Sequence, residues 1–211
     1  ARTMESILAG FASCDASKHP DCGFYPCPIM GGMPLPTELP CRAMTHEDLP
    51  HVLALQYSCY HPDFHEPLSA FESKLSASPD TCWVISAGPA AIQAYLVCLP
   101  IADENYPLLH APDWQPPMRA DELYVHDMAI SPLLRGQGAS RQLLRQAITH
   151  ATRLGLARLS LIAVQDSAAF WGHLGFAARP VTSAPLARKL ASFGADAMLM
   201  SHNLPQVSAS A

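Results

Sequence analysis

The chain of 211 residues is long enough for one sizeable hydrophobic core, or for one domain with an appendage. Its net charge of -5 disfavours an extended nucleic-acid partner, because nonspecific binding to a phosphate backbone depends on Lys and Arg. Hydrophobic residues make up 49% of the chain, yet no apolar run approaches the roughly 20 residues that a membrane-spanning helix needs. We therefore expect a cytoplasmic protein that binds neither nucleic acid nor a membrane.

The first 40 residues differ in composition from the rest of the chain. They are rich in proline and contain paired glycines, so regular elements cannot extend far. Four of the seven cysteines fall within the first 41 residues without a CxxC pair, which does not favour a zinc site. We predict an arm over residues 1–40, one globular domain over 41–205 and a flexible tail over 206–211. The arm could exchange between subunits, which would make the protein a homodimer.

The first part of the domain predicts two helices followed by a pair of strands. Apolar residues at helical spacing predict a helix over about 46–58. The segment HPDFHEP, residues 61–67, ends that helix, and a second short helix follows through Leu75. Residues 81–100 are rich in Val, Ile, Trp and Tyr and predict a β-hairpin with its turn at Gly88.

The second part begins with a long proline-containing loop over residues 101–120, and loops of that length are often functional. A strand over 122–130 follows, then a helix that ends at about Leu154, and then a strand over 157–164. This strand, helix, strand order predicts a right-handed crossover. A further helix from Ser167 to Leu174 and a last strand near 197–204 complete the predicted domain.

Two glycines, Gly136 and Gly138, stand immediately before the predicted helix. Such a turn lets the backbone approach a ligand closely, and the first N–H groups of the helix favour a negative charge such as phosphate. A dinucleotide-binding fingerprint would need a third glycine where Arg141 stands, and a Walker loop would need Lys where Ala139 stands. A tight turn without any ligand is the alternative.

The segment HDMAISPLLRGQGASRQLL, residues 126–144, resembles the pyrophosphate-binding segment of the GNAT superfamily of acyl-CoA-dependent acetyltransferases. Arg135, Gly136, Gln137 and Gly138 fit the pattern of that segment, and Ser140 occupies its last small position. The resemblance extends over about residues 42–204. The strand over 122–130 and the HPDFHEP loop are most similar to the arylalkylamine (serotonin) N-acetyltransferase-like branch.

The resemblance implies an α/β (α+β) GNAT-type fold, with a central mixed, mostly antiparallel, twisted sheet flanked by helices. It also implies acetyl-CoA as cosubstrate. The irregular spacing of His46, His61 and His65 disfavours a metal site, so we expect no metal. The residues implied in binding coenzyme A are Met128, Ala129, Ile130, Arg135, Gly136, Gln137, Gly138, Ala139, Ser140, Arg141, Ser167, Phe170 and Trp171.

Acyl transfer to an amine needs a base that removes a proton from the ammonium group. Strict alternation along the strand places four side chains on one face, namely Glu122, Tyr124, His126 and Met128. Only His126 has an unperturbed pKa that suits proton transfer near neutrality, so we predict His126 as the base. The family's tyrosine acid is replaced by Trp171, and Tyr124 or water would protonate the thiolate.

The acceptor should approach past the HPDFHEP loop and the 101–120 loop. Tyr60, Glu66 and Glu122 are candidates for binding a cationic substrate, with a solvated acidic loop as the alternative. We therefore expect a single acetyltransferase domain that acetylates a primary amine of a small molecule by direct attack. A noncatalytic acyl-CoA-binding module and a protein N-terminal or lysine acetyltransferase are the rival interpretations.

Overall fold

The computed structural model describes residues 40–86, 91–108, 110 and 113–205. Seven strands form one mixed sheet in the order β1-β2-β3-β4-β5-β7-β6. Neighbouring strands pair antiparallel, except that β4 and β5 are parallel. This arrangement confirms the predicted fold class. The strands are β1 (Cys41–Ala43), β2 (Cys82–Ser86), β3 (Ile92–Ile101), β4 (Glu122–Ile130), β5 (Arg158–Ala163), β6 (Ala177–Ala178) and β7 (Met198–Asn203).

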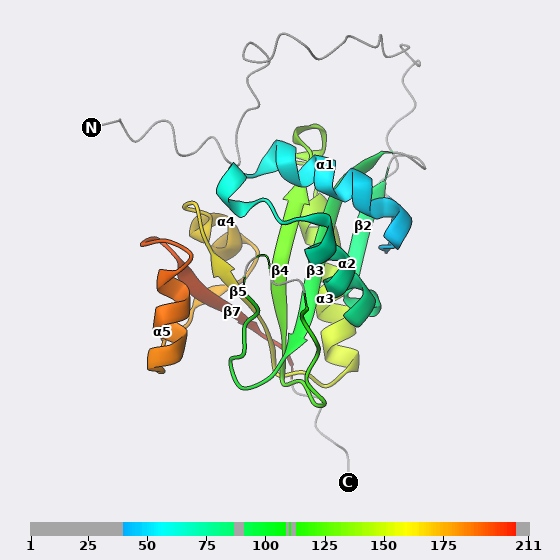
Figure 1. Ribbon diagram of the computed structural model, residues 1–211. Coiled ribbons are helices and arrows are strands. Elements are labelled where there is room, and N and C mark those ends of the chain that lie inside the picture. Colours follow the sequence, from blue (N-terminus) through cyan, green and yellow to red (C-terminus); the bar gives the residue numbers. More distant parts are fainter. Residues whose placement is uncertain (1–39, 87–90, 109, 111–112, 206–211) are drawn as a thin grey trace, which may run out of the picture.

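Helices cover both faces of the sheet (Figure 1). Helices α1 and α2 pack on one face, and α3 packs on the other. The α-helices are α1 (Leu49–Cys59), α2 (Leu68–Ala77), α3 (Ala139–Arg153), α4 (Ala168–His173) and α5 (Ala184–Ala191). The short 3-10 helices are η2 (His46–Asp48), η3 (Pro62–Phe64), η4 (Pro79–Thr81) and η5 (Pro132–Leu134).

Strand β3 shows how the two faces are built. Its side chains alternate between the faces, so that Leu96 and Cys98 pack toward α3 while Tyr95 and Val97 pack toward α1 and α2. Both faces are buried, which is why the strand is a nearly continuous apolar run in the sequence. The core therefore lies in two layers, one on each side of the central strands.

Most of the predicted elements are present in the described part of the chain. The first predicted helix begins as η2 and continues as α1, because Pro50 fits the first turn of α1 but cannot donate a hydrogen bond. Strand β1 and helix α5 were not predicted. Residues 1–39 of the predicted arm and the hairpin turn at Gly88 lie outside the described residues. Within the described residues, no helix is long and apolar enough to cross a membrane.

Strand β4 departs from the alternation that the sequence predicted. Its register with β3 shifts between Val97 and Cys98, so that His126 is an extra residue without a partner in β3. The shift is a β-bulge, which reverses the alternation of the residues that follow. Met128 consequently packs in the α3 layer with Leu123 and Val125, not on the face of His126. The expectation that Met128 shares a face with His126 was wrong.

Strands β4 and β5 remain paired over a short distance only. Three residues of β4, from Glu122 to Tyr124, pair with β5, while β4 continues to Ile130 and β5 to Ala163. The edge of β4 beyond Tyr124 therefore has no strand partner on the β5 side. This opening in the middle of the sheet positions the candidate site.

Candidate functional site

The turn between β4 and α3 adopts a conformation that its glycines permit. Gly136 and Gly138 have φ angles of 73° and 82°, in the left-handed region that costs an L-residue about 1–2 kcal/mol. Gly138 caps α3, and Gln142 N–H donates to its carbonyl at 3.0 Å. The N–H groups of Ala139, Ser140 and Arg141, which precede that of Gln142, have no partner within the helix. They are therefore free to bind an anion.

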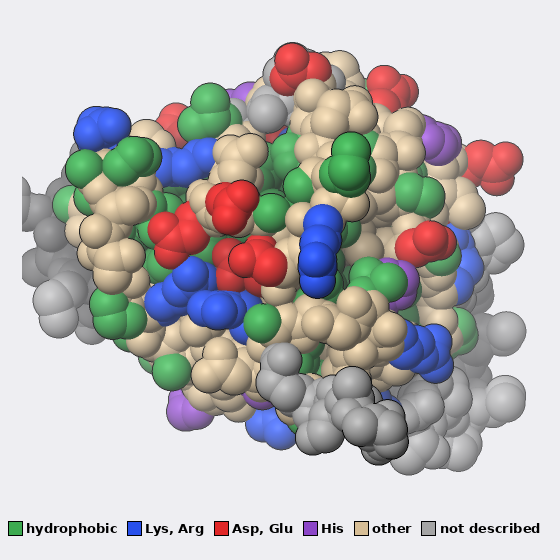
Figure 2. Space-filling view, turned by 90° about the horizontal axis from the view of Figure 1, so that it is seen from below, with side chains coloured by type: hydrophobic (Ala, Val, Ile, Leu, Met, Phe, Trp, Pro, Cys, Tyr) green, Lys and Arg blue, Asp and Glu red, His purple; other side chains and the backbone are tan. Residues whose placement is uncertain are grey.

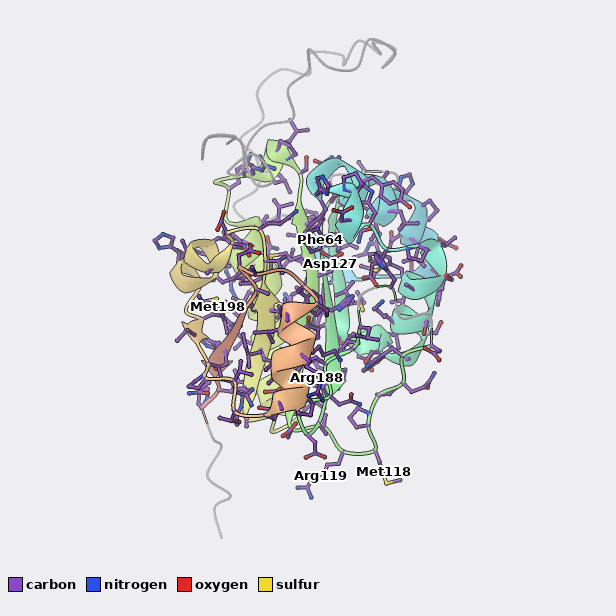
Figure 3. All side chains as sticks on the ribbon, turned by 60° about the vertical axis from the view of Figure 1, so that its left-hand side comes forward. Phe64, Met118, Arg119, Asp127, Arg188 and Met198 are labelled. Carbon is purple, nitrogen blue, oxygen red and sulfur yellow. The ribbon has the colours of Figure 1, made fainter. Side chains whose placement is uncertain are left out.

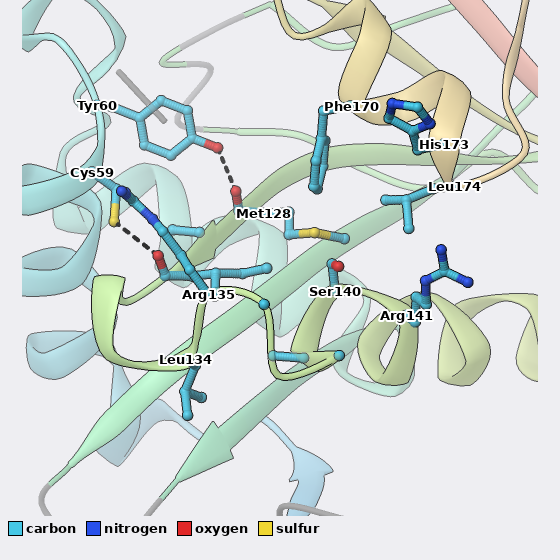
Figure 4. Close-up of a pocket in the computed structure, with 15 residues that line it drawn as sticks. Cys59, Tyr60, Met128, Leu134, Arg135, Ser140, Arg141, Phe170, His173 and Leu174 are labelled. Carbon is cyan, nitrogen blue, oxygen red and sulfur yellow. Dashed lines mark hydrogen bonds between the residues drawn. The ribbon is translucent and has the colours of Figure 1, made fainter. Parts of the chain in front are cut away.

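A cavity of about 430 Å³ lies over this turn, and we refer to it as the glycine-turn cavity (Figure 4). A Cβ atom added at Gly136 or Gly138 would meet no atom within 4 Å, so the space above the turn is open. The lining residues are Cys59, Tyr60, Met128, Ala129, Ile130, Leu134, Arg135, Gly136, Gly138, Ala139, Ser140, Arg141, Phe170, His173 and Leu174.

The chemistry of the glycine-turn cavity fits a phosphorylated ligand with an apolar portion. Arg135 and Arg141 bring positive charge to the two sides of the turn (Figure 4). The first turn of α3 adds N–H groups and the positive end of the helix dipole. Met128, Phe170 and Leu174 give the rest of the wall an apolar surface. The residues present therefore fit a diphosphate joined to a mostly uncharged chain.

A second, smaller cavity of about 70 Å³ lies at the opening between β4 and β5, and we refer to it as the His126 cavity. Tyr60 and Met128 line both cavities, so the two spaces are neighbours. Phe64 and Asp127 lie close together at this end of the sheet, whereas Met118 and Arg119 of the long loop lie at the opposite end (Figure 3). The His126 cavity is lined by Gln56, Tyr60, Phe64, Glu66, Tyr124, Val125, His126, Asp127, Met128, Leu161, Ile162, Val164, Gln165, Ser167, Trp171 and Phe193.

His126 is paired with a buried carboxylate. Its Nε2 atom lies 2.6 Å from Glu66 Oε1, and the two side chains are 3% and 1% exposed. Burial opposes ionisation of Glu66, but His126 and Lys74 outweigh it and hold the pKa of that carboxyl well below its usual range. An ionised Glu66 can only accept a hydrogen bond, so a neutral imidazole at this position would carry its proton on Nε2 and its lone pair on Nδ1. Nδ1 is buried without a hydrogen-bond partner among the described residues.

Glu66 itself is held by groups from several elements. Lys74 Nζ of α2 donates to Glu66 Oε2 at 2.6 Å, and the His110 backbone N–H donates to the same oxygen at 2.9 Å. The Glu66 backbone N–H donates to Gln56 Oε1 at 2.9 Å. Because both the side chain and the backbone of Glu66 are bonded, its carboxylate has one well-defined position against His126.

Asp127, the residue after His126, belongs to the same buried region. Tyr95 Oη donates to Asp127 Oδ2 at 2.7 Å, and Gln56 Nε2 donates to that oxygen at 3.0 Å. Burial raises the pKa of Asp127, although the hydrogen bond from Tyr95 acts in the opposite direction. Gln56 therefore connects the backbone of Glu66 to the side chain of Asp127.

Two side chains at the end of α1 bond to backbone carbonyls of β4. Tyr60 Oη donates to the Met128 carbonyl at 2.6 Å, and Cys59 Sγ lies 3.7 Å from the Ile130 carbonyl (Figure 4). These carbonyls lie on the stretch of β4 that has no partner in β5. A ligand that pairs with this backbone would therefore have to replace the Tyr60 and Cys59 donors at the two carbonyls.

Comparison with known proteins decides the family. The model of the acetyltransferase (GNAT) family matches residues 48–176, which is more than half of the chain. The match includes the β4 residues that line both cavities and the α3 residues that line the glycine-turn cavity. The chain belongs to the acetyltransferase (GNAT) family. The protein is therefore an acyl-CoA-dependent N-acyltransferase with acetyl-CoA as cosubstrate. No curated protein matches the chain.

Solved structures share the fold of this GNAT protein. The loading GNATL domain of CurA from Lyngbya majuscula has a TM-score of 0.65 at 12% identity, over 79% of this chain and 98% of that one. The ribosomal-protein-S18-alanine N-acetyltransferase from Escherichia coli has a TM-score of 0.55 at 16% identity, over 82% and 99%. A chain of the NatC complex bound to Gag peptide and CoA has a TM-score of 0.58 at 19% identity, over 80% and 99%.

The remaining predicted residues of the acetyltransferase lie in different places. Gln137 does not line the glycine-turn cavity, and its side chain donates to the Leu133 carbonyl at 2.6 Å. Ser167 and Trp171 line the His126 cavity instead of the glycine-turn cavity. Tyr124 also lines the His126 cavity, where burial raises its pKa and makes it a poor proton donor.

Glu122 lies outside both cavities, although it was expected to bind the substrate. It accepts hydrogen bonds from Tyr106 Oη at 2.7 Å and from Arg179 at 2.8 Å. Arg179 also pairs with Glu104 at 2.8 Å. Acidic and basic side chains lie next to one another on the lower face of the molecule, where β4 begins (Figure 2). The charge of Glu122 is therefore compensated by Arg179, at the end of β4 that is farther from the glycine turn.

Sequence reasoning missed several residues of the site. Cys59, Leu134, His173 and Leu174 line the glycine-turn cavity, and Lys74 is a buried partner of Glu66. Lys74 gave a signal that could have been read, because it falls on the apolar face of α2 between Phe71 and Leu75. Among the described residues, no group of three or more His, Cys, Asp or Glu could hold a metal ion.

Proposed function

We propose that the protein transfers the acetyl group of acetyl-CoA to the primary amine of a small molecule, with His126 as the general base. The observation that carries the proposal is the pairing of His126 Nε2 with Glu66, which leaves Nδ1 buried and without a partner. A neutral imidazole oriented by a carboxylate is a common arrangement for a general base. The base lies at the opening of the sheet, next to the glycine-turn cavity.

The glycine-turn cavity would hold acetyl-CoA, which supplies the activated acetyl group when it is bound. Amides of residues 136–141 would bind its diphosphate, with Arg135 and Arg141 adding charge. Met128, Ala129 and Ile130 would contact its pantetheine arm, and Phe170 would pack against it. The N–H group of Met128 would polarise the thioester carbonyl.

In the reaction, the amine nitrogen forms a bond to the acetyl carbon as the bond from that carbon to the sulfur of coenzyme A breaks. His126 Nδ1 takes the proton that the nitrogen must lose. The sulfur leaves as a thiolate and takes its proton from water, because burial raises the pKa of Tyr124 and disfavours it as the acid. Solvent then removes the proton from His126 and restores the neutral base.

Direct attack on the thioester is favoured over a route through an acetylated cysteine. Cys82 and Cys98 are fully buried in the core. Burial raises the pKa of Cys82 to about 12 and that of Cys98 well above its usual range, so neither thiolate forms readily. Cys59 lines the glycine-turn cavity, but burial raises its pKa as well.

A small acceptor is favoured by the size of the His126 cavity. The cavity has a volume of about 70 Å³, and Tyr60, Phe64 and Phe193 are among its walls. Such a space accommodates an amine on a narrow chain more readily than a folded protein surface. A peptide N-terminus is the alternative acceptor, and a panel that contains small primary amines and short peptides separates the two by their kcat/KM values.

The test of the proposed function is the His126→Gln variant. Gln keeps a polar side chain at the position but cannot act as a base near neutral pH. We expect acetyl-CoA to bind with unchanged affinity in calorimetry, while turnover in a free-thiol assay falls by about 100-fold or more. Turnover equal to that of the wild-type protein would exclude His126 as the base. A wild-type protein that binds acetyl-CoA but acetylates no amine or peptide of the panel would instead indicate a noncatalytic binding module.

A further inference from the structure

Lys74 is a buried lysine that lines neither cavity. Its side chain is 1% exposed, on the face of α2 that packs toward the sheet. Lysine is almost never fully buried unless it is paired, because removing an ammonium group from water is costly. Its partner is Glu66 Oε2, 2.6 Å from Nζ, and the Ala70 carbonyl lies 3.5 Å away. The shortest hydrogen bond of the ammonium group is therefore the one to the carboxylate that contacts His126.

The net charge of the buried group formed by Lys74, Glu66 and His126 depends on Lys74. Glu66 has two oxygens, of which one contacts Lys74 and the other contacts His126. With Lys74 charged, an ionised Glu66 is already compensated, and the imidazole can remain neutral. Without the ammonium group, the buried carboxylate would be compensated by protonation of His126 alone. A protonated His126 could not accept a proton from the substrate.

We propose that Lys74 is a positioning residue that acts through Glu66 and keeps His126 neutral, with its proton on Nε2 and its lone pair on Nδ1. The inference rests on the proposed function, because it assigns a partner to the base named there. It gives a role to a charged side chain on the buried face of α2, where an apolar side chain would otherwise pack.

Other groups also face His126 and act on its charge. From β4, Asp127 is adjacent and Tyr124 lies with its ring centroid 5.8 Å from that of His126. Immediately after α1, Tyr60 reaches the His126 cavity, and burial raises its pKa and keeps it a neutral phenol. The described residues of β5 and of the loop and helix up to Trp171 that line this cavity are uncharged. Lys74 is therefore the cationic side chain that the described structure places against the Glu66 carboxylate.

The pH dependence of kcat/KM for the amine tests the proposal, because its acid limb reports the base of the free enzyme. The free amine contributes the same ionisation to every variant, so differences between variants come from the protein. We expect Lys74→Met to move the acid limb to higher pH by roughly one unit. We expect Glu66→Gln to move it to lower pH, since the anion that favours the imidazolium ion is removed.

Two further variants separate a positioning role from a merely structural one. Lys189→Met removes a lysine from α5 that has no part in the proposed site, and it should leave the acid limb of the kcat/KM profile unchanged. Lys74→Met leaves a buried carboxylate without its lysine partner, which disfavours folding, whereas Lys74→Met combined with Glu66→Gln leaves no lone charge. In the double variant the limb should lie between those of the wild-type protein and of Glu66→Gln. An identical limb in all these variants would overturn the proposal.

Nitrogen-15 NMR of labelled histidine gives a readout that does not depend on activity. The signals of His126 are identified among those of the ten histidines by their loss in His126→Gln. At neutral pH the wild-type protein should show the Nε2-protonated tautomer, and Lys74→Met should show more of the imidazolium form. A wild-type His126 that is already an imidazolium ion would overturn the proposal.

Failure of this inference is distinguishable from failure of the proposed function. If His126→Gln retains full turnover, the base is wrongly assigned and both proposals fail. If His126→Gln is inactive but Lys74→Met shows neither the shifted limb nor the altered NMR signals, the proposed function stands and only the role of Lys74 is overturned.

Discussion

His126 and Asp127 are consecutive in strand β4, yet their side chains both reach the network that α1 and the η3–α2 segment supply. His126 bonds to Glu66 and Asp127 bonds to Gln56, which in turn accepts from the Glu66 backbone. The β-bulge makes this possible, because consecutive residues of a regular strand point to opposite faces. His126 and its neighbour Asp127 thus share one buried polar network.

Tyr95→Phe tests the importance of that network for stability. The change removes the hydroxyl that donates to Asp127 at 2.7 Å and keeps the ring. We expect the free energy of unfolding in urea to fall by about 1–3 kcal/mol, because a buried acceptor loses a donor. The pKa of Asp127 should rise further, since the Tyr95 hydrogen bond lowers it. Tyr57→Phe, at a half-exposed position of α1, should be neutral, and equal losses in the two variants would contradict the prediction.

Gly138→Ala tests the turn that precedes α3. Gly138 has a φ of 82°, so the substitution should lower the free energy of unfolding by about 1 kcal/mol and raise the KM for acetyl-CoA. Gly155→Ala is a matched control, because Gly155 has a φ of 68° and open space around it but lies at the other end of α3. The control should lose stability without any change in KM. A raised KM in both variants would indicate a general effect of strain.

The two arginines of the glycine-turn cavity should act through their charge. We expect Arg135→Gln and Arg141→Gln each to raise the KM for acetyl-CoA roughly three- to fivefold at low salt. The effect should shrink as salt is added, because ions screen exposed charges. Arg153→Gln, at the exposed end of the same helix, is the control. Steady-state kinetics at two salt concentrations check the prediction, which fails if the control responds equally.

Acid should destabilise the protein partly through Glu66. Although burial opposes its ionisation, His126 and Lys74 hold the folded-state pKa of Glu66 below the value of about 4.3 in the unfolded chain. The contribution of Glu66 to the free energy of unfolding is therefore complete above the pKa of the unfolded chain. It is lost as the pH falls from that value toward the folded-state pKa. Between pH 6 and 3.5 we expect the wild-type protein to lose on the order of 1 kcal/mol more than the Glu66→Gln, Lys74→Met double variant. Urea titrations at the two pH values measure the difference, and parallel losses would refute it.

Glu122→Gln distinguishes a structural carboxylate from a substrate-binding one. The side chain is 3% exposed and pairs with Arg179, so we expect a loss of about 3 kcal/mol in the free energy of unfolding. The KM for the amine should be unchanged, since Glu122 lies outside the His126 cavity. A raised KM with unaltered stability would restore Glu122 as a substrate-binding residue.

The fold could be predicted from the sequence because its signals are local. The glycine junction, the apolar periodicity of α3 and the β-rich run of residues 81–100 each depend on residues close together in the chain. Strand β1 has only three residues and gives no periodicity to recognise. Helix α5 has only eight residues and contains a proline in its first turn, so it offers little helical periodicity to recognise.

The candidate site was less predictable because it depends on contacts between distant segments. The partners His126 and Glu66 are 60 residues apart, and nothing near either one identifies the other. The bulge at His126 reversed the alternation on which the position of Met128 had been predicted. Glu122 is an acidic residue on the same strand as His126, and only the fold reveals that Arg179 forms an ion pair with it.

The opening between β4 and β5 has a consequence for the order of events. Tyr60 and Met128 are common walls of two spaces, one beside the first turn of α3 and the other beside the end of α1. If acetyl-CoA and the amine occupy these two spaces, as proposed above, both can be present together, and neither has to depart before the other binds. In the proposed reaction, a sheet that separates halfway along its length would thus remove any need for the protein to carry the acetyl group on one of its own side chains.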